Sequence, residues 1–483
     1  MTPESDKKLA TPDKKLADRP VTIWLTDRSR YTTGTGRCGQ ERYLTNHFGP
    51  TGYGIVRKSE SLPLATGTYA HQALEVLFRH LLETDTFPSV DLIREAIQTT
   101  LQAYQKKIEA RGYAGLFQNQ RADEVVREQQ YLITGLIWAT CHTVLPWLHQ
   151  EFRVVQAEQE STYVLDCTCG LLPTDDLAQH DARDCDGVGL MLKQDVVAER
   201  RQGSGVAYFE AKTTGFAGDS WAEAWETKPQ LALGTLGIPE RLGKEITETY
   251  IIGLYKGSRK KSGEGEDQIV RQESAFCYGY CKPANPPLSP DDWLPSYQWT
   301  DDLTRETKRA SRAHKKRGVW ELEGSDWPIW LAAKAHDPTL QPAEFWIATL
   351  PKSVLEHAVF VVGPMNRQDA QIQKLTRQVA GEEQHWKQIL WQLYDLQSQG
   401  HEWASETFQA ALDRLVPASW DCRRFGKGSE CQFVPICFRQ EGWTDPLGGG
   451  RYVARRPHHM PELEQAISRG LLPESSDEAG DEE

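Results

Sequence analysis

The chain has 483 residues, of which 39% are hydrophobic and 25% are charged. This composition excludes collagen-like and wholly disordered chains, and the length allows one large domain or two to three ordinary ones. A net charge of −13 argues against a protein that coats nucleic acid with its whole surface. No run approaches the roughly 18 uninterrupted apolar residues of a membrane span, so we expect a cytosolic protein without a membrane partner.

The two ends of the sequence are polar. Residues 1–20 hold a near-duplicated DKKLA and have no apolar face, which is typical of a flexible leader. Residues 441–483 finish in a cluster of acidic side chains, and we expect a polar acidic tail there.

Between these ends the hydrophobic period changes along the chain. Apolar residues recur at helical spacing over 64–150 and again over 366–416, whereas strand-like alternation marks 151–256. Residues 258–327 are polar, basic and punctuated by proline, which is typical of long loops. Because no linker separates two complete patterns, we expect a single domain over 21–440. Its predicted fold is α/β, a mixed central sheet flanked by helices and decorated by further helices.

The segment 194–214, QDVVAERRQGSGVAYFEAKTT, carries the main candidate chemistry. A turn at 202–205 separates two strands, so Asp195 at the start of the first and Glu210 on the second can converge, with Lys212 beside them. Two carboxylates can hold Mg²⁺ or Mn²⁺, and a nearby ammonium can orient water and stabilise charge at phosphorus. The set suits phosphodiester hydrolysis, although Glu-x-Lys by itself is common at strand ends.

This segment resembles the PD-(D/E)xK nuclease superfamily, in which an Asp on one strand and an acid-x-Lys on the next bind metal and activate water. The chain is more narrowly similar to the RecB-type exonuclease branch. Its GTYAHQALE at 67–75 resembles that branch's helix with a metal-binding histidine, which is His71 here. The resemblance implies a restriction-endonuclease-like sheet.

The resemblance also implies roles for individual residues. Lys212 would position the attacking water, and Gln230 would be a further catalytic residue. The Tyr that often follows this Gln four residues later is replaced by Gly234 in this chain. The metal ligands that the resemblance implies are His71, Asp195, Glu210 and the carbonyl oxygen of Ala211.

A second signal is the spacing Cys422-x8-Cys431-x5-Cys437, with Cys38 far away in the sequence. Four thiolates suit Zn²⁺ or a 4Fe-4S cluster, and the spacing does not separate the two. This arrangement, with one cysteine before the nuclease core and three after it, resembles that of AddB-type helicase-nucleases and of the exonucleases of CRISPR adaptation. The resemblance implies a 4Fe-4S cluster on these four residues. From its loop at 420–438, the cluster would join the N- and C-terminal parts and stabilise the domain.

An insertion between the first two expected strands holds a further set of zinc-ligand types, Cys167, Cys169, His180 and Cys185. Their spacing is not a common zinc pattern, so a zinc site and incidental thiols in an exposed loop both remain open. The pair His458 and His459 has no partner at metal-ligand spacing, and we expect it in a loop.

Several basic and aromatic residues are candidates for contact with DNA. Two basic runs could contact phosphates or could be solvated loops. Trp221 and Trp225 lie one helical turn apart after the Glu-x-Lys strand and could stack on single-stranded bases, whereas we expect most other tryptophans in the core. The basic residues concerned are Lys256, Arg259, Lys260, Lys261, Lys315, Lys316 and Arg317.

These features predict a Mg²⁺- or Mn²⁺-dependent DNA exonuclease that acts on ends or single strands in recombination, repair or phage replication. We expect it in the cytoplasm of a bacterial or phage-infected cell. Because the chain lacks the Gly-x4-Gly-Lys-Ser/Thr motif, any helicase would be a separate partner. The alternatives are a catalytically inactive scaffold that binds DNA with the same fold, and a zinc-stabilised interaction protein.

Overall fold

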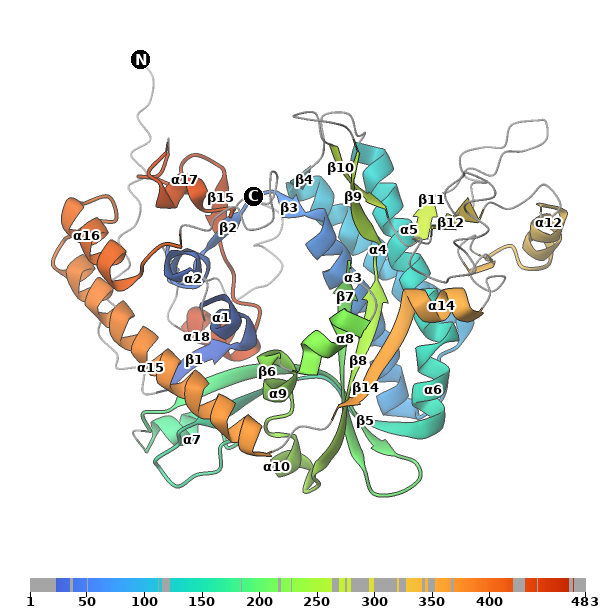
Figure 1. Cartoon of the computed structure of the whole chain (residues 1–483), viewed down its shortest axis with the longest axis horizontal. Coiled ribbons are helices and arrows are strands. Elements are labelled where there is room, and N and C mark those ends of the chain that lie inside the picture. Colours follow the sequence, from blue (N-terminus) through green and yellow to red (C-terminus); the bar gives the residue numbers. More distant parts are fainter. Residues whose placement is uncertain are drawn as a thin grey trace, which may run out of the picture.

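A computed structural model gives the fold of most of the chain (Figure 1). The described residues are 23–34, 38–49, 51–111, 113–114, 122–183, 185–215, 219–226, 228–262, 269–273, 276–278, 295–298, 319–320, 327–340, 344–345, 352–365, 369–419, 431–440, 442–468 and 472. The predicted leader 1–20, Cys422 and the basic residues Lys315, Lys316 and Arg317 lie outside them.

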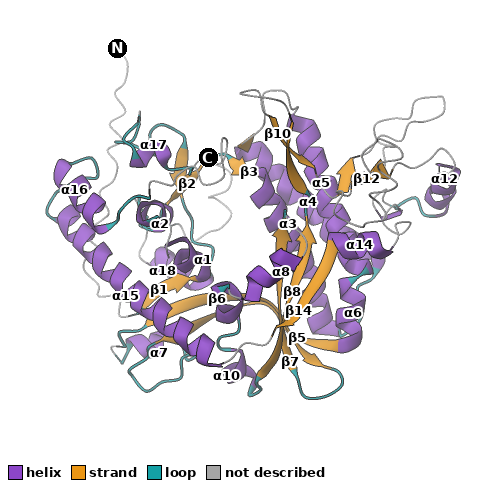
Figure 2. Cartoon of the chain, viewed as in Figure 1, coloured by secondary structure: helices purple, strands orange, loops and turns teal. Residues whose placement is uncertain are grey.

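A mixed six-stranded sheet forms the centre of the protein, as expected from the sequence (Figure 2). Its strands are β1 (Trp24–Asp27), β5 (Phe152–Leu165), β6 (Val188–Arg200), β7 (Val206–Thr214), β8 (Ile246–Tyr255) and β14 (Val359–Met365). The order is β1-β6-β7-β8-β14, and β5 pairs with β6 along its other edge. The β1–β6 and β7–β8 pairs are parallel and the others antiparallel. Two of these strands, β1 and β14, come from outside the predicted sheet region 151–256.

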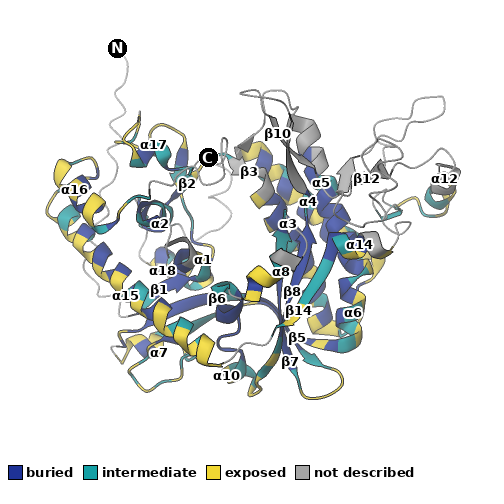
Figure 3. Ribbon diagram, viewed as in Figure 1, coloured by how far each residue is buried: buried dark blue, intermediate teal, exposed yellow. Residues whose placement is uncertain are grey.

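The inner strands are apolar along almost their whole length because helices or neighbouring segments cover both faces (Figure 3). In β6 and β7 nearly every residue is buried, so charged side chains within them are exceptions that need a partner. These exceptions include Lys193, Asp195, Glu210 and Lys212, which all lie in the middle part of the sheet.

One edge of β6 changes partner along its length. β1 pairs with residues 188–191 of β6, and β7 pairs with residues 196–199, while β5 pairs along the opposite edge throughout. The two ladders on the first edge therefore diverge around residues 192–195. We call this point the strand fork.

Four helices cover one side of the sheet, which confirms the helical character of 64–150 (Figure 1). They are α3 (Leu62–Thr84), α4 (Val90–Arg111), α5 (Ala122–His142) and α6 (Val144–Glu151). The apolar residues at helical spacing in α3, among them Leu74, Leu77 and Phe78, are buried in the same hydrophobic cluster as Phe152 and Phe209 of the sheet. The segment Gln129–Glu151 is long and apolar enough to cross a membrane, but 72% of its apolar window is buried inside the protein, as in core helices.

Segments from both ends of the sequence lie side by side beyond β1 (Figure 1). The N-terminal segments are α1 (Arg28–Gly34), α2 (Gly39–Asn46) and β2 (Ile55–Arg57), and the C-terminal ones are α15 (Asp369–Ser398), α16 (Glu406–Leu415), α17 (Val434–Cys437), β15 (Tyr452–Ala454) and α18 (Met460–Ser468). β15 pairs with β2, and Arg42 of α2 forms a fully buried ion pair with Glu383 of α15 at 2.6 Å. The helical prediction for 366–416 is confirmed by α15 and α16.

Two boundary predictions are wrong. Residues 442–468 are not part of a polar tail, because β15 pairs with β2 and Glu462 of α18 forms a buried ion pair with Arg30. The region 258–327 is not only loop. It contains a hairpin of β9 (Ser258–Ser262) and β10 (Ile269–Glu273) and a small sheet of β11 (Phe276–Tyr278), β12 (Pro295–Gln298) and β13 (Val319–Trp320).

Short elements complete the described fold. Residues 219–226 and 229–234 form two short helices, and Pro229 begins the second. The remaining elements are β3 (Glu60–Ser61), β4 (Tyr113–Ala114), α7 (Leu177–Asp181), α8 (Asp219–Glu226), α9 (Pro229–Gly234), α10 (Ile238–Leu242), α12 (Trp327–His336) and α14 (Lys352–Ala358).

Candidate metal centre at the strand fork

The strand fork brings Asp195 and Glu210 together. Val196 pairs with Phe209 in the antiparallel β6–β7 ladder, so the next residues outward are Asp195 and Glu210. The Asp195 carboxylate accepts a hydrogen bond from the backbone N–H of Ala211 at 2.6 Å. Both carboxyl groups are buried, with 7% and 0% of each residue exposed. Asp195 lies inside β6 and does not begin it, which differs from the predicted strand start.

Helix α3 places His71 over the same point. A Cβ atom on Gly67 would lie 2.7 Å from Oγ1 of Thr213, so the glycine allows α3 to approach β7 closely. His71 follows one helical turn later on the same face. Its ligand nitrogen lies within 4.8 Å of a carboxylate oxygen of Asp195.

Glu158 on β5 is the third member of this group, and sequence reasoning missed it. It faces Asp195 between the pairs Ala157–Val196 and Gln159–Gln194. One ligand atom each of His71, Glu158 and Asp195 lies within 4.8 Å of the other two. Glu158 has φ of 49°, a left-handed conformation that costs a non-glycine residue about 1 kcal/mol or more and is often found at functional sites.

Glu210 has a different set of neighbours. Arg28, the first residue of α1, donates to its carboxylate at 2.9 Å, and the ammonium of Lys212 lies 2.6 Å from its other oxygen. The hydroxyl of Tyr208 also donates to it. Arg28 reaches the backbone as well, donating to the carbonyl oxygen of Lys193 at 3.1 Å. Arg28 was not predicted, since its place beside Glu210 depends on the parallel pairing of β1 with β6.

The pKa values of the carboxyl groups are displaced in opposite directions. Burial, with the charge of nearby Glu210, raises the pKa of Asp195 to about 6. Burial and the charge of Asp195 raise the pKa of Glu158 to about 8, although Lys193 lies 3.1 Å away and opposes this. Burial alone would raise the pKa of Glu210, but Arg28 and Lys212 lower it to about 2.

His71 is held in its neutral form. Burial and the positive charge of Lys212 lower its pKa to about 4. A neutral imidazole has a free nitrogen lone pair, so it can bind a metal ion at neutral pH. The buried carboxyl groups of Asp195 and Glu158 face each other without enough cations to balance their charge. Together with the imidazole of His71 they form a donor set that a divalent cation would stabilise.

Gln230, predicted as a catalytic residue, lies beside Arg28 and contacts it through its backbone. Its carbonyl oxygen accepts a hydrogen bond from Arg28 at 3.4 Å. A Cβ atom on Gly234 would lie 2.6 Å from the hydroxyl oxygen of Tyr208. A larger side chain at position 234 would therefore displace the ring that donates to Glu210.

The predicted cluster cysteines lie where the two ends of the sequence meet. The sulfur of Cys38 accepts hydrogen bonds from the backbone N–H groups of Glu41 at 3.5 Å and Ser419 at 3.3 Å. Cys431 and Cys437 pack against the hydrophobic cluster that contains residues of α2, α15 and α16. These three described cysteines do not form a metal-sized group like that of His71, Glu158 and Asp195, and Cys422 lies outside the described residues.

Among the described residues, two further groups of potential metal ligands contain histidine and lie outside the strand fork. Cys167, Cys169, His180 and Cys185 form a group that could bind a metal ion. A second group joins Asp27 to His458 and His459, so this histidine pair does have a partner, brought near by the fold. Arg30 forms an ion pair with Asp27 at 3.4 Å, and this positive charge disfavours a cation there.

Both candidate stacking residues, Trp221 and Trp225, pack against the hydrophobic core, which disfavours stacking of Trp225 on DNA bases, and their contact with DNA stays a prediction. Trp225 is only 4% exposed and lies in a hydrophobic cluster with Tyr208, while Trp221 packs against the same cluster and Phe360. Of the basic residues, Lys256 follows β8, whereas Arg259, Lys260 and Lys261 lie on β9. Their contact with DNA stays a prediction.

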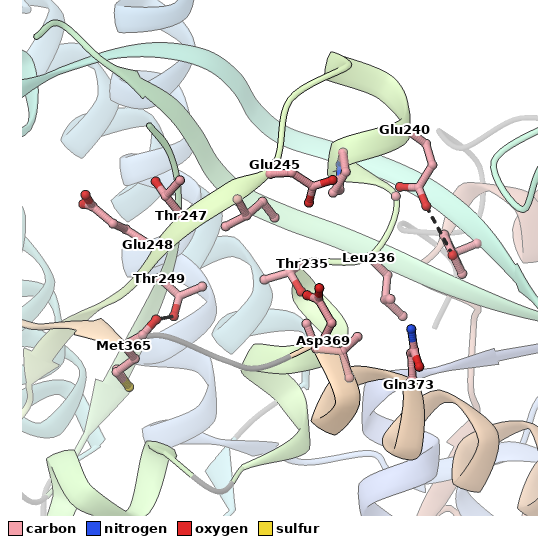
Figure 4. A pocket seen from close by; sticks show the side chains of 15 residues that line it. Thr235, Leu236, Glu240, Glu245, Thr247, Glu248, Thr249, Met365, Asp369 and Gln373 are labelled. Carbon is pink, nitrogen blue, oxygen red and sulfur yellow. Dashed lines mark hydrogen bonds between the residues drawn. The ribbon is translucent and has the colours of Figure 1, made fainter. Parts of the chain in front are cut away.

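A separate cavity of about 370 Å³ lies on another part of the sheet, between β8, α10 and the start of α15 (Figure 4). Its labelled residues include Glu240, Glu245 and Asp369, and Glu240 accepts a hydrogen bond from Tyr163 across its edge. None of its lining residues belongs to the strand fork. This cavity and the charged residues at the strand fork are therefore different places.

We compared the chain with protein-family models and with curated proteins, and neither comparison gave a match.

Proposed function

We propose that the protein is a Mg²⁺- or Mn²⁺-dependent DNA nuclease of the PD-(D/E)xK type. The observation that carries this proposal is the buried convergence of His71, Glu158 and Asp195 beside the Glu210–Lys212 pair. Oxygen ligands suit Mg²⁺, and the imidazole favours a softer ion such as Mn²⁺.

In this proposal His71, Glu158 and Asp195 hold the metal ion, and Glu210 joins them only if its pairing with Arg28 loosens. A bound divalent ion would polarise the phosphodiester and lower the pKa of a bound water. Lys212, whose side chain is 25% exposed, presents its ammonium to the attacking water and to the charge that develops at phosphorus. Glu210, fixed by Arg28 and Tyr208, keeps that ammonium in place.

Hydrolysis adds one water molecule across a P–O bond. The water oxygen bonds to phosphorus, the ester oxygen leaves with a proton, and the products are a phosphate end and a hydroxyl end. The resemblance to RecB-type exonucleases favours ends or single strands of DNA as substrate, in recombination, repair or phage replication, with any helicase as a separate partner. We propose a cytoplasmic location for this activity.

We also propose that Cys38, Cys422, Cys431 and Cys437 hold a 4Fe-4S cluster. Two features of the described residues support this. Backbone N–H groups already donate to the sulfur of Cys38, as is common around cluster thiolates, and Ser419 begins the segment that leads to Cys422. In a cubic cluster each thiolate binds a different iron, so the sulfurs stand further apart than around a single zinc ion.

Cleavage of DNA by the variant Lys212→Ala tests the enzymatic role. We expect its rate on end-labelled single- and double-stranded DNA with Mn²⁺ to fall by about 100- to 1,000-fold, since charge stabilisation at phosphorus is lost. The matched control is Lys244→Ala, because this half-exposed lysine pairs with Glu199 at 2.7 Å. It should cleave like the native protein.

Full activity of Lys212→Ala would contradict the mechanism. A native protein that binds DNA but does not cleave it would favour the inactive scaffold, an alternative supported by the Arg28–Glu210 ion pair that occupies an expected metal ligand. Absence of both DNA binding and cleavage would favour the zinc-stabilised interaction protein.

A further inference from the structure

The insertion between β5 and β6 brings four potential metal ligands into one small space. The sulfur atoms of Cys167 and Cys169 lie 3.2 Å apart, and they lie 3.4 and 3.3 Å from Nδ1 of His180. The sulfur of Cys185 lies 3.7 Å from that of Cys167. All four ligand atoms lie within 4.8 Å of one another. We call these residues the thiol group.

These separations, 3.2 to 3.7 Å for the four pairs above, lie within a few tenths of an ångström of the edges of a tetrahedral zinc site. Zn–S bonds of about 2.3 Å and Zn–N bonds of about 2.0 Å place neighbouring ligand atoms roughly 3.4 to 3.8 Å apart. A disulfide between Cys167 and Cys169 would need its sulfurs at about 2.05 Å, much closer than they are. The arrangement therefore favours a shared ion over a covalent bridge.

The surroundings of His180 also suit a metal ligand. Its Nε2 lies 3.0 Å from the carbonyl oxygen of Leu172, so Nε2 carries the proton and the lone pair of Nδ1 points at the thiols. Such an outer hydrogen bond fixes the ring and its tautomer in many zinc sites. His180 is 0% exposed and Cys185 is 1% exposed, so the polar edge of the ring is enclosed by the insertion itself.

We propose that the thiol group binds one Zn²⁺ in a closed structural site with three thiolates and one imidazole. All four tetrahedral positions are filled by the chain, so no position is left for a reacting water. This proposal does not depend on the nuclease function, because Cys185 lies outside the strand fork and makes no contact used by it.

The position of the site indicates what the zinc would stabilise. Cys185 packs with Ile23 and Leu25, which belong to the segment that leads into β1 and to β1 itself. The next residue, Asp186, forms an ion pair with Lys387 of α15 at 2.6 Å. A zinc ion that fixes the insertion would therefore hold β1 and α15 against the start of β6.

Metal analysis of the full-length protein tests this proposal. We expect about one zinc per chain in the native protein and a loss of at least about 80% of it in both Cys185→Ser and His180→Ala. Cys141→Ala is the matched control, since Cys141 is a buried thiol of α5 outside the group, and it should keep its zinc. Iron, measured in the same samples, reports separately on Cys38, Cys431 and Cys437.

A second measurement covers the case in which the variants fail to fold. Native protein exchanged with Co²⁺ should show thiolate-to-cobalt charge-transfer absorption and tetrahedral d–d bands. Zinc that stays at the native level in folded Cys185→Ser and His180→Ala would overturn the proposal. So would a native protein that holds no zinc and gives no cobalt spectrum, or a Cys167–Cys169 disulfide found by mass spectrometry of freshly purified protein.

Discussion

The strand fork lies within the sheet, whereas the thiol group lies in the insertion that connects β5 to β6, and the two differ in their donors. The fork combines two carboxylates with a neutral imidazole and has the cations Arg28, Lys193 and Lys212 beside it. The thiol group has three sulfurs and an imidazole, which complete a tetrahedron without help from solvent. Three donors leave positions open for water and substrate, whereas four close the shell. Under the two proposals, ligand type and ligand number distinguish a site suited to chemistry from one suited to stability.

Removing a fork carboxylate should have the largest effect on activity and little effect on stability. We expect Asp195→Asn to reduce Mn²⁺-dependent cleavage by about 1,000-fold or more, because a central metal ligand is lost. Its melting temperature should stay within about 2 °C of the native protein or rise. The raised pKa of Asp195 means that the fold does not favour its charge, so neutralising it costs little stability.

Single-turnover cleavage, thermal unfolding and zinc content of Asp195→Asn, measured together, check this prediction. Zinc should be unchanged. Cleavage within tenfold of the native rate would remove the fork from the chemistry, and a loss of zinc would mean that the two sites are not independent.

Replacing Arg28 should slow cleavage less than replacing a direct metal ligand, although the sequence did not predict a role for this residue. In Arg28→Ala, Glu210 loses one of the two cations that pair with it among the described residues and keeps Lys212. We expect a 10- to 100-fold slower cleavage and a higher pKa of Glu210, which shifts the acidic limb of the pH–rate profile upward. Arg28→Lys, which retains the charge, should recover part of the rate. A profile with an unchanged acidic limb in Arg28→Ala would contradict the role of this residue.

The smallest expected effect is on stability as a function of pH. The folded pKa values of Asp195 and Glu158, about 6 and about 8, lie above their ordinary values of 3.8 and 4.5. The folded state therefore binds more protons, and these groups lower the free energy of unfolding as pH rises from about 4 to about 8. Mn²⁺ replaces those protons, so its stabilising effect should grow over the same interval.

Thermal unfolding at pH 5.5 and pH 8 without added Mn²⁺ tests the sign, with Glu158→Gln as the comparison. Removing this carboxyl group should reduce the difference between the two melting temperatures by about 3 °C. A chelator is avoided because it would also remove zinc. An equal or larger difference in Glu158→Gln would contradict the account of these carboxyl groups.

The periodicity of the sequence predicted the sheet and both helical regions. Because the inner strands are buried on both faces, they are long and apolar, and the few charged residues within them stand out in the sequence. Asp195, Glu210 and Lys212 could be selected in this way, whereas His71 was implied by the family resemblance, and the four do meet at one place. Glu158 could not be selected, because its position opposite Asp195 depends on the register of two long strands. Local patterns contain no information about that register.

For two tryptophans, the polarity of the neighbouring residues in the sequence was a poor guide to packing. Trp221 and Trp225 are surrounded by polar residues in the sequence, yet their helix turns them toward Tyr208 and Phe360 of the core. Likewise, the residues after 441 are polar in composition, but pairing of β15 with β2 and of Glu462 with Arg30 orders them. Tertiary contacts decided both cases. The tryptophans pack against residues of β7 and β14, whereas the residues after 441 contact the N-terminal segments.

Anomalous diffraction from one crystal grown with Mn²⁺ tests the central claim most directly, because data at the manganese and zinc edges locate both ions. The account predicts manganese among His71, Glu158 and Asp195, and zinc among Cys167, Cys169, His180 and Cys185. Manganese absent from the strand fork, with Glu158 still paired to Lys193 as it is here, would contradict the account.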